Sequence, residues 1–408
     1  MQATNTEGVL PSSRNTPQSP PLPSELLSQI FRYYLQLSTP YNPEPAQRLR
    51  QSCLAEHLLL VCKSWHDAAT ADGSLWREII LDPEIALVTP YKSLHSYTKV
   101  RSIRSRTQLL HISINNDPDL IKRLGYLKAY YYLVTTMSRW ERLLYYLKYY
   151  DIAACITIQH LAASTPNLRE VVIRSPIRAL KGLSEILPET PNLKFLEIDM
   201  PSIGPLPLSL CTSVTIASIR IAELPNWLNT ITQFKSIHTL ILKPVHSVHS
   251  DDTWTMLNLP LDLPSVQTLI LVGGTNSLQS RLGSIKLLAL QTLEVDLSPS
   301  GLEKRWSRTM AGGRDQLTRL LNAGLRELVL NSVWFDRCED AFDMLQDANG
   351  SVGKLVCIDV TCTLQSGKGQ KLEIDLGATL MQHGAVSPSS ALSVLDGLLK
   401  KKESSCLN

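Results

Sequence analysis

The chain has few aromatic residues, little net charge and no long apolar run, and each shortage excludes a class of protein. Aromatic side chains make up 6% of the 408 residues, and the formal net charge is +3. Without a strongly basic surface or interleaved stacking aromatics, we expect no nucleic-acid partner. No apolar run reaches the about 20 residues that cross a membrane. The richest run, Tyr130 to Val134, is short and flanked by Lys128 and Arg139, so we expect no membrane partner.

Motifs of the common catalytic and cofactor sites are also missing. The sequence contains no phosphate-binding Gly-x-x-x-x-Gly-Lys-Ser/Thr loop, no His-Glu-x-x-His and no Gly-x-Ser-x-Gly. The nearest approach to a metal site is the polar stretch His246-Ser-Val-His249-Ser-Asp251-Asp252, whose spacing is generic. We expect a polar loop there, and we predict no metal, no cofactor and no enzymatic activity.

Cysteine is present, but not in the patterns of metal or redox sites. We find no Cys-x-x-Cys pair and no secretory signal pattern, and therefore expect reduced, mostly buried thiols in a cytoplasmic or nuclear protein. Cys357 and Cys362 lie in and just after an expected strand, where burial is a better explanation than nucleophilic use. The full set is Cys53, Cys62, Cys155, Cys211, Cys338, Cys357, Cys362 and Cys406.

Apolar residues recur at helical spacing in two stretches between Pro21 and Leu81. Pro23 suits a first helical turn, and the charge of Glu25 suits the positive end of the helix dipole. Helices this short bury little surface among themselves, so we expect part of the apolar surface to meet a partner. The first stripe contains Leu26, Leu27, Ile30, Phe31, Tyr34 and Leu35, and the second contains Leu54, Leu58, Val61, Cys62, Trp65 and Ala69.

Three motifs follow one another in this segment: Leu22-Pro-x-Glu-Leu-Leu-x-x-Ile-Phe31, Val61-Cys-Lys-x-Trp65 and Leu75-Trp-x-x-Ile79. By these motifs the segment resembles an F-box, the helical module by which many eukaryotic proteins dock on the Skp-family adaptor of a cullin-based ubiquitin ligase. It departs from the family in the long Pro-rich insert between the two stripes, Ser38 to Gln47.

The resemblance implies a set of adaptor-binding residues, although the sequence does not separate interface positions from core positions. The alternative is that these side chains form the core of a helical cap on the next domain. The set comprises Leu22, Pro23, Leu26, Leu27, Ile30, Phe31, Leu58, Val61, Cys62, Trp65, Leu75 and Trp76.

A short unit of the form apolar-x-x-apolar-x-apolar recurs along the rest of the chain. It starts at residues 109, 168, 193, 214, 237, 266, 290, 325 and 355, with a degenerate copy near Trp140 to Leu143. Spacing and pattern resemble an irregular leucine-rich repeat, although Pro201 and Val333 stand where that repeat has Asn or Cys. The resemblance implies parallel strands on a concave face. Convex helices are expected around Leu183–Leu187, Trp227–Phe234, Gln316–Asn322 and Ala341–Leu345.

Five regions follow from these patterns. We predict a disordered leader (1–20), an F-box (21–82), a linker helix (83–106), a leucine-rich-repeat-like solenoid (107–376) and a tail with a short amphipathic helix (377–408). The linker helix carries Lys99, Arg101, Arg104 and Arg106, which we interpret as a solvated face rather than an anion site. Near the end of the solenoid, Leu355 to Val360 and Lys371 to Leu376 are expected to form a hairpin or a terminal cap.

The tryptophans of the repeats have two possible roles. Trp140 and Trp227 are expected to fill the repeat core, whereas Trp254, Trp306 and Trp334 lie in expected loops and could be core or ligand-facing.

The fold class is therefore α/β, with a helical F-box followed by an irregular leucine-rich-repeat solenoid. By resemblance, the protein is a substrate-recognition subunit of an SCF-type ubiquitin ligase. It would hold the Skp-family adaptor, and through it a cullin, with its F-box, and an unknown target with its repeats. The alternative is a leucine-rich-repeat scaffold that binds protein partners without promoting ubiquitination.

Overall fold

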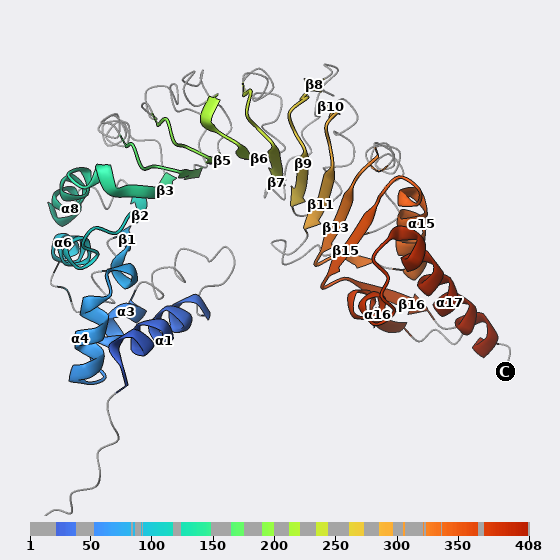
Figure 1. Ribbon diagram of the computed structural model, residues 1–408, viewed down its shortest axis with the longest axis horizontal. Helices are drawn as coiled ribbons and strands as arrows, with labels where there is room; N and C mark the ends of the chain where they lie inside the picture. The colour runs from blue at the N-terminus through green and yellow to red at the C-terminus, as the bar shows by residue number, and fades with distance from the viewer. Residues whose placement is uncertain are drawn as a thin grey trace, which may run out of the picture.

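The chain forms an arch in which a parallel sheet lines the inner face, and this face is called the inner face below (Figure 1). A helical module stands at the N-terminal end and a cap of helices and strands at the C-terminal end. The computed structural model describes residues 22–37, 53–82, 85, 91, 93–116, 124–147, 165–174, 190–199, 212–220, 234–243, 261–272, 285–296, 305–306, 321, 324–335, 337–365 and 371–406. Among the described helices, none combines the length and apolar character needed to cross a membrane.

The N-terminal module consists of α1 (Ser24–Leu37), α3 (Leu54–Leu58), α4 (Lys63–Ala71) and the 3-10 turn η1 (Gly73–Trp76). Its buried residues form a core of their own, separate from the core of the arch. The backbone amides of Leu26 and Leu27 both donate to the carbonyl of Pro23, which places Pro23 at the start of α1. This start agrees with the expectation drawn from the sequence.

Eleven strands of the described chain form the large sheet, and each pairs in parallel with its neighbour. Nine coincide with the units read from the sequence, and β3 coincides with the degenerate copy. The exception is β1, whose residues the sequence pattern places in the helical module. In order across the sheet the strands are β1 (Glu78–Leu81), β2 (Leu110–Asn116), β3 (Trp140–Leu147), β4 (Glu170–Arg174), β5 (Phe195–Asp199), β6 (Ile216–Arg220), β7 (Thr239–Lys243), β9 (Thr268–Val272), β11 (Thr292–Asp296), β13 (Glu327–Asn331) and β15 (Lys354–Ile358).

Alternation along each strand sends one set of side chains into the core and the other to the inner face. Leu269 is in register with Leu240 and Leu293, and all three side chains are fully buried. The next residue along, Ile270, is only half-buried. Because every unit places its apolar residues at the same register, the core is continuous along the arch, as a solenoid-like repeat requires.

Helices cover the outer side of the first strands. They are α6 (Leu94–Arg104) and α8 (Leu124–Val134), followed by the turn η2 (Met137–Arg139); the expected linker helix thus exists and is shorter than predicted. Of the convex helices expected further along, Ala341–Leu345 lies in a helix of the cap. The stretches Leu183–Leu187, Trp227–Phe234 and Gln316–Asn322 lie outside the described residues, apart from Phe234 and Leu321.

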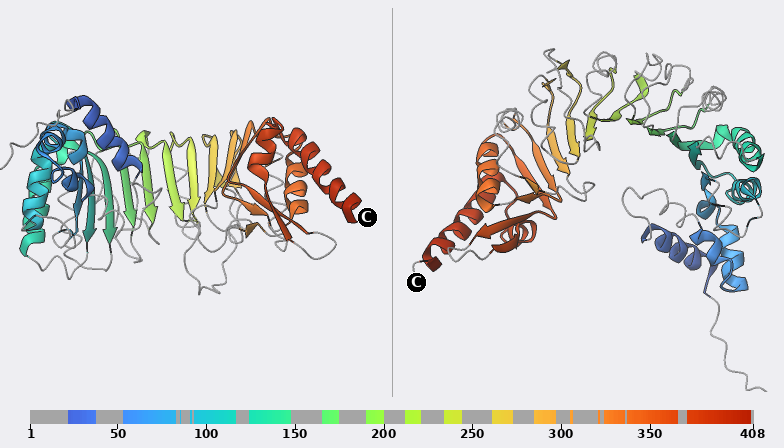
Figure 2. Two further views of the ribbon diagram at one scale, coloured as in Figure 1. Left: turned by 90° about the horizontal axis from the view of Figure 1, so that it is seen from below. Right: turned by 180° about the vertical axis from the view of Figure 1, so that it is seen from behind.

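The C-terminal cap packs on the last strands of the arch (Figure 2). It contains α15 (Cys338–Ala348), α16 (Leu376–Gln382) and α17 (Pro388–Cys406), and α17 includes the amphipathic helix expected over Ser390 to Lys402. A hairpin is present, but it joins β16 (Thr361–Gln365) to β17 (Lys371–Asp375), because β15 is the last strand of the large sheet. Small sheets at the margin add β8 (Leu261–Asp262) with β10 (Ile285–Lys286), and β12 (Arg305–Trp306) with β14 (Trp334–Phe335).

The cap also corrects the expectation that the thiols are reduced. Cys338, at the start of α15, and Cys362, in β16, form a disulfide, with their Cα atoms 5.1 Å apart. The two lie 24 residues apart in sequence, so only the packing of α15 beside β16 brings them together. Cys62 and Cys357 are free thiols in the described chain.

Candidate functional site

One face of α1 builds the core of the helical module. Leu27 and Phe31 are 2% and 0% exposed, and the ring of Phe31 lies 5.0 Å from that of Trp65, measured between centroids. Trp76 closes this core and donates a 2.7 Å hydrogen bond from Nε1 to the carbonyl of Ala69. The apolar face that the module needs for its own folding is thus already occupied.

The adjoining face of α1 is apolar as well, yet it is open to solvent. Leu26 and Ile30 are 46% and 47% exposed, and the neighbouring side chains of the same face are similar. We call this surface the exposed stripe; it consists of Leu22, which precedes α1, and of Leu26, Ile30, Tyr33 and Tyr34 of α1. A contiguous apolar surface left in water is typical of a docking site for another protein.

The turn between α3 and α4 exposes a second apolar group. Leu60 and Val61 are 78% and 57% exposed, and the Cys62 thiol is also exposed. Leu60 and Tyr33 were absent from the predicted site. Both had a signal in the sequence, since Leu60 ends the run Leu58-Leu-Leu60 and Tyr33 lies one helical turn beyond Ile30.

The structure divides the predicted adaptor-binding residues into two groups. The exposed group is Leu22, Pro23, Leu26, Ile30, Val61 and Cys62, with Trp65 half-buried. The other group lies in the core of the module, where almost none of its side-chain surface is open to an adaptor in the free chain. They hold the exposed stripe in place, because a helix this short needs tertiary packing to remain folded. The buried group is Leu27, Phe31, Leu58, Leu75 and Trp76.

A buried ion pair fastens the module to the arch. Arg101 of α6 and Glu56 of α3 have side chains 1% and 2% exposed, and Arg101 Nη2 lies 2.7 Å from Glu56 Oε2. Arg101 Nη1 also donates to the carbonyl of Glu78, 2.7 Å away. Burial alone lowers the pKa of Arg101, but the interactions with Tyr97 and Glu56 outweigh it and raise that pKa, so the guanidinium stays charged. The solvated face predicted for this helix is therefore wrong at Arg101.

The junction is tight elsewhere too. Arg101 and Arg104 lie over the ring of Trp76, with their Cζ atoms 5.5 Å and 4.5 Å from its centroid. Gly73 approaches α6 so closely that a Cβ atom at that position would lie 2.9 Å from the Ser105 carbonyl oxygen. Since β1 follows directly, the orientation of the exposed stripe relative to the inner face is fixed.

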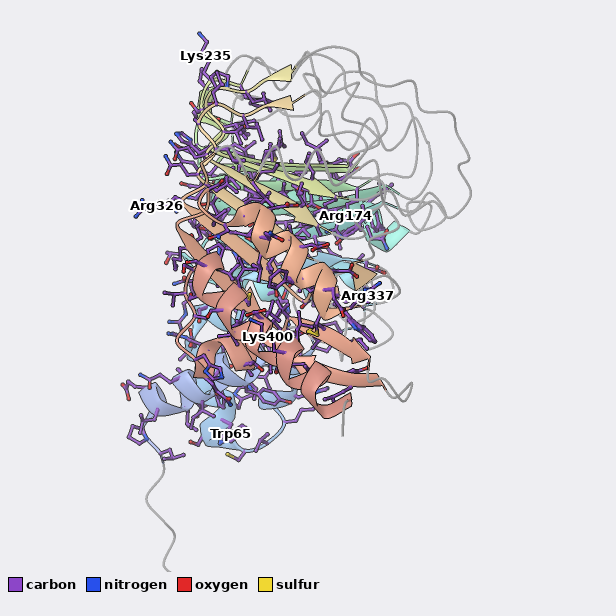
Figure 3. All side chains as sticks on the ribbon, turned by 90° about the vertical axis from the view of Figure 1, so that its right-hand side faces the viewer. Trp65, Arg174, Lys235, Arg326, Arg337 and Lys400 are labelled. Atoms are coloured by element: carbon purple, nitrogen blue, oxygen red, sulfur yellow. A yellow bond between two sulfur atoms is a disulfide. The ribbon has the colours of Figure 1, made fainter. Side chains whose placement is uncertain are left out.

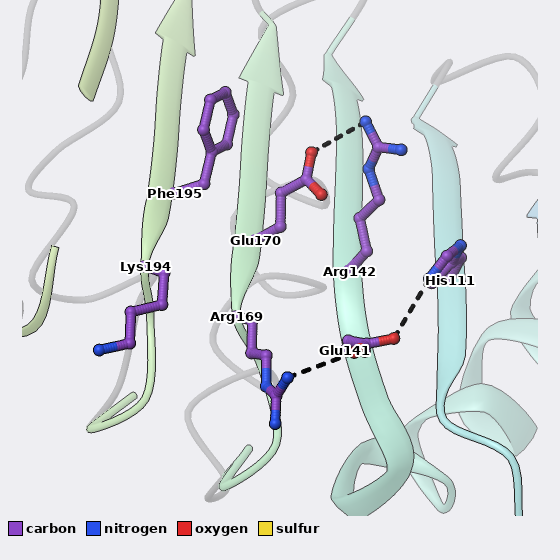
Figure 4. Close-up of a pocket in the computed structure, with 7 residues that line it drawn as sticks. All are labelled: His111, Glu141, Arg142, Arg169, Glu170, Lys194 and Phe195. Carbon is purple, nitrogen blue, oxygen red and sulfur yellow. Dashed lines mark hydrogen bonds and ion pairs between the residues drawn. The ribbon is translucent and has the colours of Figure 1, made fainter. Parts of the chain in front are cut away.

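A hollow of about 390 Å³ lies on the inner face across β2 to β5, at the end nearest the module (Figure 4). Its lining is mostly charged, and four of its residues are in register across the four strands: His111, Arg142, Glu170 and Phe195. Of the others, Glu141 is the second residue of β3, and Arg169 and Lys194 lie immediately before β4 and β5.

Both carboxylates of the hollow are engaged by neighbouring cations. Glu170 Oε1 lies 2.8 Å from Arg142 Nη2. Glu141 accepts from Arg77 Nη2 at 2.5 Å, lies 3.3 Å from His111 Nε2, and is 3.9 Å from Arg169 Nη1. Arg77 follows Trp76 of the module, so one wall of the hollow is bonded to the N-terminal segment.

His111 is neutral at physiological pH. Burial, together with the positive charge of Arg77, lowers the pKa of His111 to about 4, although the hydrogen bond with Glu141 acts in the opposite direction. The imidazole therefore adds no positive charge to the hollow near pH 7.

The remaining candidate residues lie as follows. Within the described chain no group of three or more His, Cys, Asp or Glu side chains is placed to hold a metal, and His246 to Asp252 lie outside that part. Burial raises the pKa of the Cys357 thiol to about 12, which disfavours nucleophilic use. Trp140 is fully buried in the repeat core, as predicted, and Trp334 is half-buried and donates to Thr363. Trp227, Trp254 and the side chain of Trp306 are outside the described residues.

Comparison with known proteins bears on the N-terminal segment. A comparison of the whole chain with curated proteins found no match. Residues 20–82, which contain the helical module and β1, match the F-box-like family. The segment that carries the exposed stripe is thus an F-box-like domain, which supports a role for this protein as an adaptor-binding subunit of SCF-type complexes.

Proposed function

We propose that this protein is the substrate-recognition subunit of an SCF-type ubiquitin ligase. The F-box-like domain docks on a Skp-family adaptor, and through it on a cullin, while the arch binds a target protein. The observation that carries the proposal is the exposed stripe of α1. The module has a complete core without Leu26 and Ile30, so these side chains are available to an adaptor.

The arch is the second half of the proposal. Its strand units follow the Leu-x-x-Leu-x-Leu pattern and pair in parallel along a curved inner face, which supports an irregular leucine-rich repeat. Such faces are extended and bind protein surfaces. We assign the target to the inner face.

The contribution of this chain to ubiquitination is proximity rather than chemistry. Holding the target beside the charged ubiquitin carrier raises the effective concentration of target lysines. In this proposal the chain is not an enzyme and needs no cofactor, and it works in the cytoplasm or the nucleus.

The exposed stripe is tested by the double variant Leu26→Asp/Ile30→Asp, compared with the unaltered chain after affinity purification and mass spectrometry. Two carboxylates placed in an apolar contact lose their hydration without gaining a partner, so adaptor recovery should fall about tenfold or more. The module should remain folded, because both positions are solvent-exposed in the free chain.

A matched control makes the same change at two exposed apolar positions outside the F-box-like domain, Leu288→Asp/Met381→Asp, whose side chains are 78% and 77% exposed. Unchanged adaptor recovery is expected there. A Leu26→Asp/Ile30→Asp chain that melts like the unaltered one and still binds the adaptor would overturn the docking role of the stripe. Recovery of adaptor without cullin would favour the scaffold alternative.

A further inference from the structure

The hollow across β2 to β5 is lined by more positive than negative side chains. Glu170 forms an ion pair with Arg142, and Glu141 forms one with Arg77 at 2.5 Å. Arg169 reaches Glu141 only at 3.9 Å, and its side chain is 65% exposed. For the exposed Lys194 ammonium, no acceptor is found among the described residues.

Two cations are therefore left to face the solvent on adjacent strand starts. Figure 4 shows Arg169 and Lys194 on neighbouring strands at the lower edge of the hollow, with Phe195 and the Arg142–Glu170 pair above them. Arg142 is itself only partly satisfied, since its Nε donates to no described residue. His111 is neutral and neither adds to this positive charge nor removes it.

The composition of the hollow selects the kind of ligand. Pockets for small molecules are mostly apolar and enclosed, whereas six of the seven residues here are charged or polar, with Phe195 as the exception. A nucleic acid would need stacking aromatics along its path, and the lining provides one ring. An anion with some apolar character fits best.

The size of the hollow favours a segment of polypeptide over a free ion. Its lining comes from four adjacent strands, and three inter-strand spacings of about 4.8 Å make a span of about 14 Å. An extended chain of about four residues has the same length. An isolated phosphate would fill only one part of this span.

We propose that the hollow binds an acidic segment of the target protein, with Arg169 and Lys194 pairing with its carboxylate or phosphate groups and Phe195 packing against its side chains. This assignment rests on the proposed function only in naming the occupant as the target. The hollow lies at the F-box end of the arch, and Arg77 of the F-box-like domain bonds to its wall. A segment bound there is held close to the adaptor.

The test measures fluorescence anisotropy of labelled peptides with the full chain. The probes are a short glutamate-rich peptide, the same length with phosphoserines among neutral residues, and a neutral glutamine-rich peptide. The unaltered chain should bind at least one acidic probe and not the neutral one, with an affinity that falls as salt is added. The stronger of the two acidic probes identifies carboxylate or phosphate as the preferred group.

The double variant Arg169→Glu/Lys194→Glu should weaken binding of the acidic probe about tenfold or more, because it replaces attraction by repulsion. The control Lys235→Glu/Arg326→Glu makes the same charge change at exposed positions that precede other strands, Lys235 before β7 and Arg326 before β13 (Figure 3). We expect the control to bind as the unaltered chain does, apart from a small long-range effect that salt removes.

Three outcomes would overturn the assignment: no binding of either acidic probe, equal loss in both double variants, or tighter binding of single-stranded RNA or anionic lipid vesicles at the same two residues. Each outcome is independent of the docking role of α1. If the chain recovers no adaptor but binds the acidic probe through Arg169 and Lys194, the proposed function is refuted and the acidic-segment site is supported. If the chain recovers the adaptor but does not bind the acidic probe, only the acidic-segment site is refuted.

Discussion

At the scale of the residue, the most sensitive contact is the ion pair between Glu56 and Arg101. Both side chains are almost fully buried, and removing one partner of a buried pair leaves the other charge unpaired in a dry interior. We predict that Arg101→Met lowers the free energy of unfolding by about 3–5 kcal/mol. Chemical denaturation followed by circular dichroism measures this difference.

The double variant Glu56→Met/Arg101→Met is the informative comparison, because it removes both charges together. Replacing both members of a buried pair by apolar residues is often nearly neutral, so most of the loss should be recovered. A single variant as stable as the unaltered chain would mean that water or another residue solvates Glu56 when Arg101 is gone.

His111 gives the arch a stability that depends on pH. Its pKa in the folded chain is about 4, below the ordinary value of about 6.5, so between these values the unfolded chain binds the proton more readily. The free energy of unfolding must then decrease as the pH falls from about 6.5 toward 4, by at most about 1.4 kcal/mol per pH unit from this group.

The variant His111→Gln should make that decrease shallower, and urea unfolding at pH 7 and pH 5 measures it. His238→Gln, which alters an exposed histidine just before β7, is the control and should leave the decrease unchanged. Identical pH dependence in the His111 variant and the unaltered chain would show that this imidazole is not shielded from the proton.

At the scale of the element, the sequence predicted the repeating strands well, because their signal is local. Each unit alternates core-facing and surface-facing residues over about six positions. A buried apolar residue stands at the register of Leu269 in every unit, and it is a leucine in all but three of them, which have Ile112, Val171 and Ala217. Burial on one face fixes the register, since a shift by one residue would expose the core. The sequence pattern does not predict the strand β1, because Ile79 to Leu81 fit the end of a helical module equally well.

What the sequence could not supply depends on contacts between distant residues. Helical spacing marks Leu26 and Phe31 alike as apolar, and only the packing of α4 against α1 shows that Phe31 is core and Leu26 is surface. The Cys338–Cys362 disulfide and the Glu56–Arg101 pair have the same origin. The hollow was missed because its residues come from four strands that the sequence keeps about 20 to 30 residues apart.

At the scale of the whole molecule, the F-box-like domain is also the N-terminal cap of the arch. It contributes β1, which covers the edge of β2, and its Glu56 neutralises Arg101 of α6. A solenoid needs a cap at each end to cover its last core layer, and the helices α15, α16 and α17 serve the other end. Adaptor docking and solenoid stability are therefore carried by the same segment, on different residues.

A chain that lacks residues 1–82 tests this double role. Without β1, the backbone of β2 becomes an open strand edge, and Arg101 loses its carboxylate partner, so we predict self-association and a lower melting temperature. Size-exclusion chromatography with light scattering separates this from simple loss of docking, because Leu26→Asp/Ile30→Asp should stay monomeric with an almost unchanged melting temperature. A truncated chain that remains monomeric and unfolds cooperatively near the original temperature would mean that the arch is complete without the F-box-like domain. The domain would then be an appended docking module, and its deletion would be a clean control for adaptor binding. The pairing of β1 with β2 and the Glu56–Arg101 ion pair instead predict that the deletion destabilises the arch.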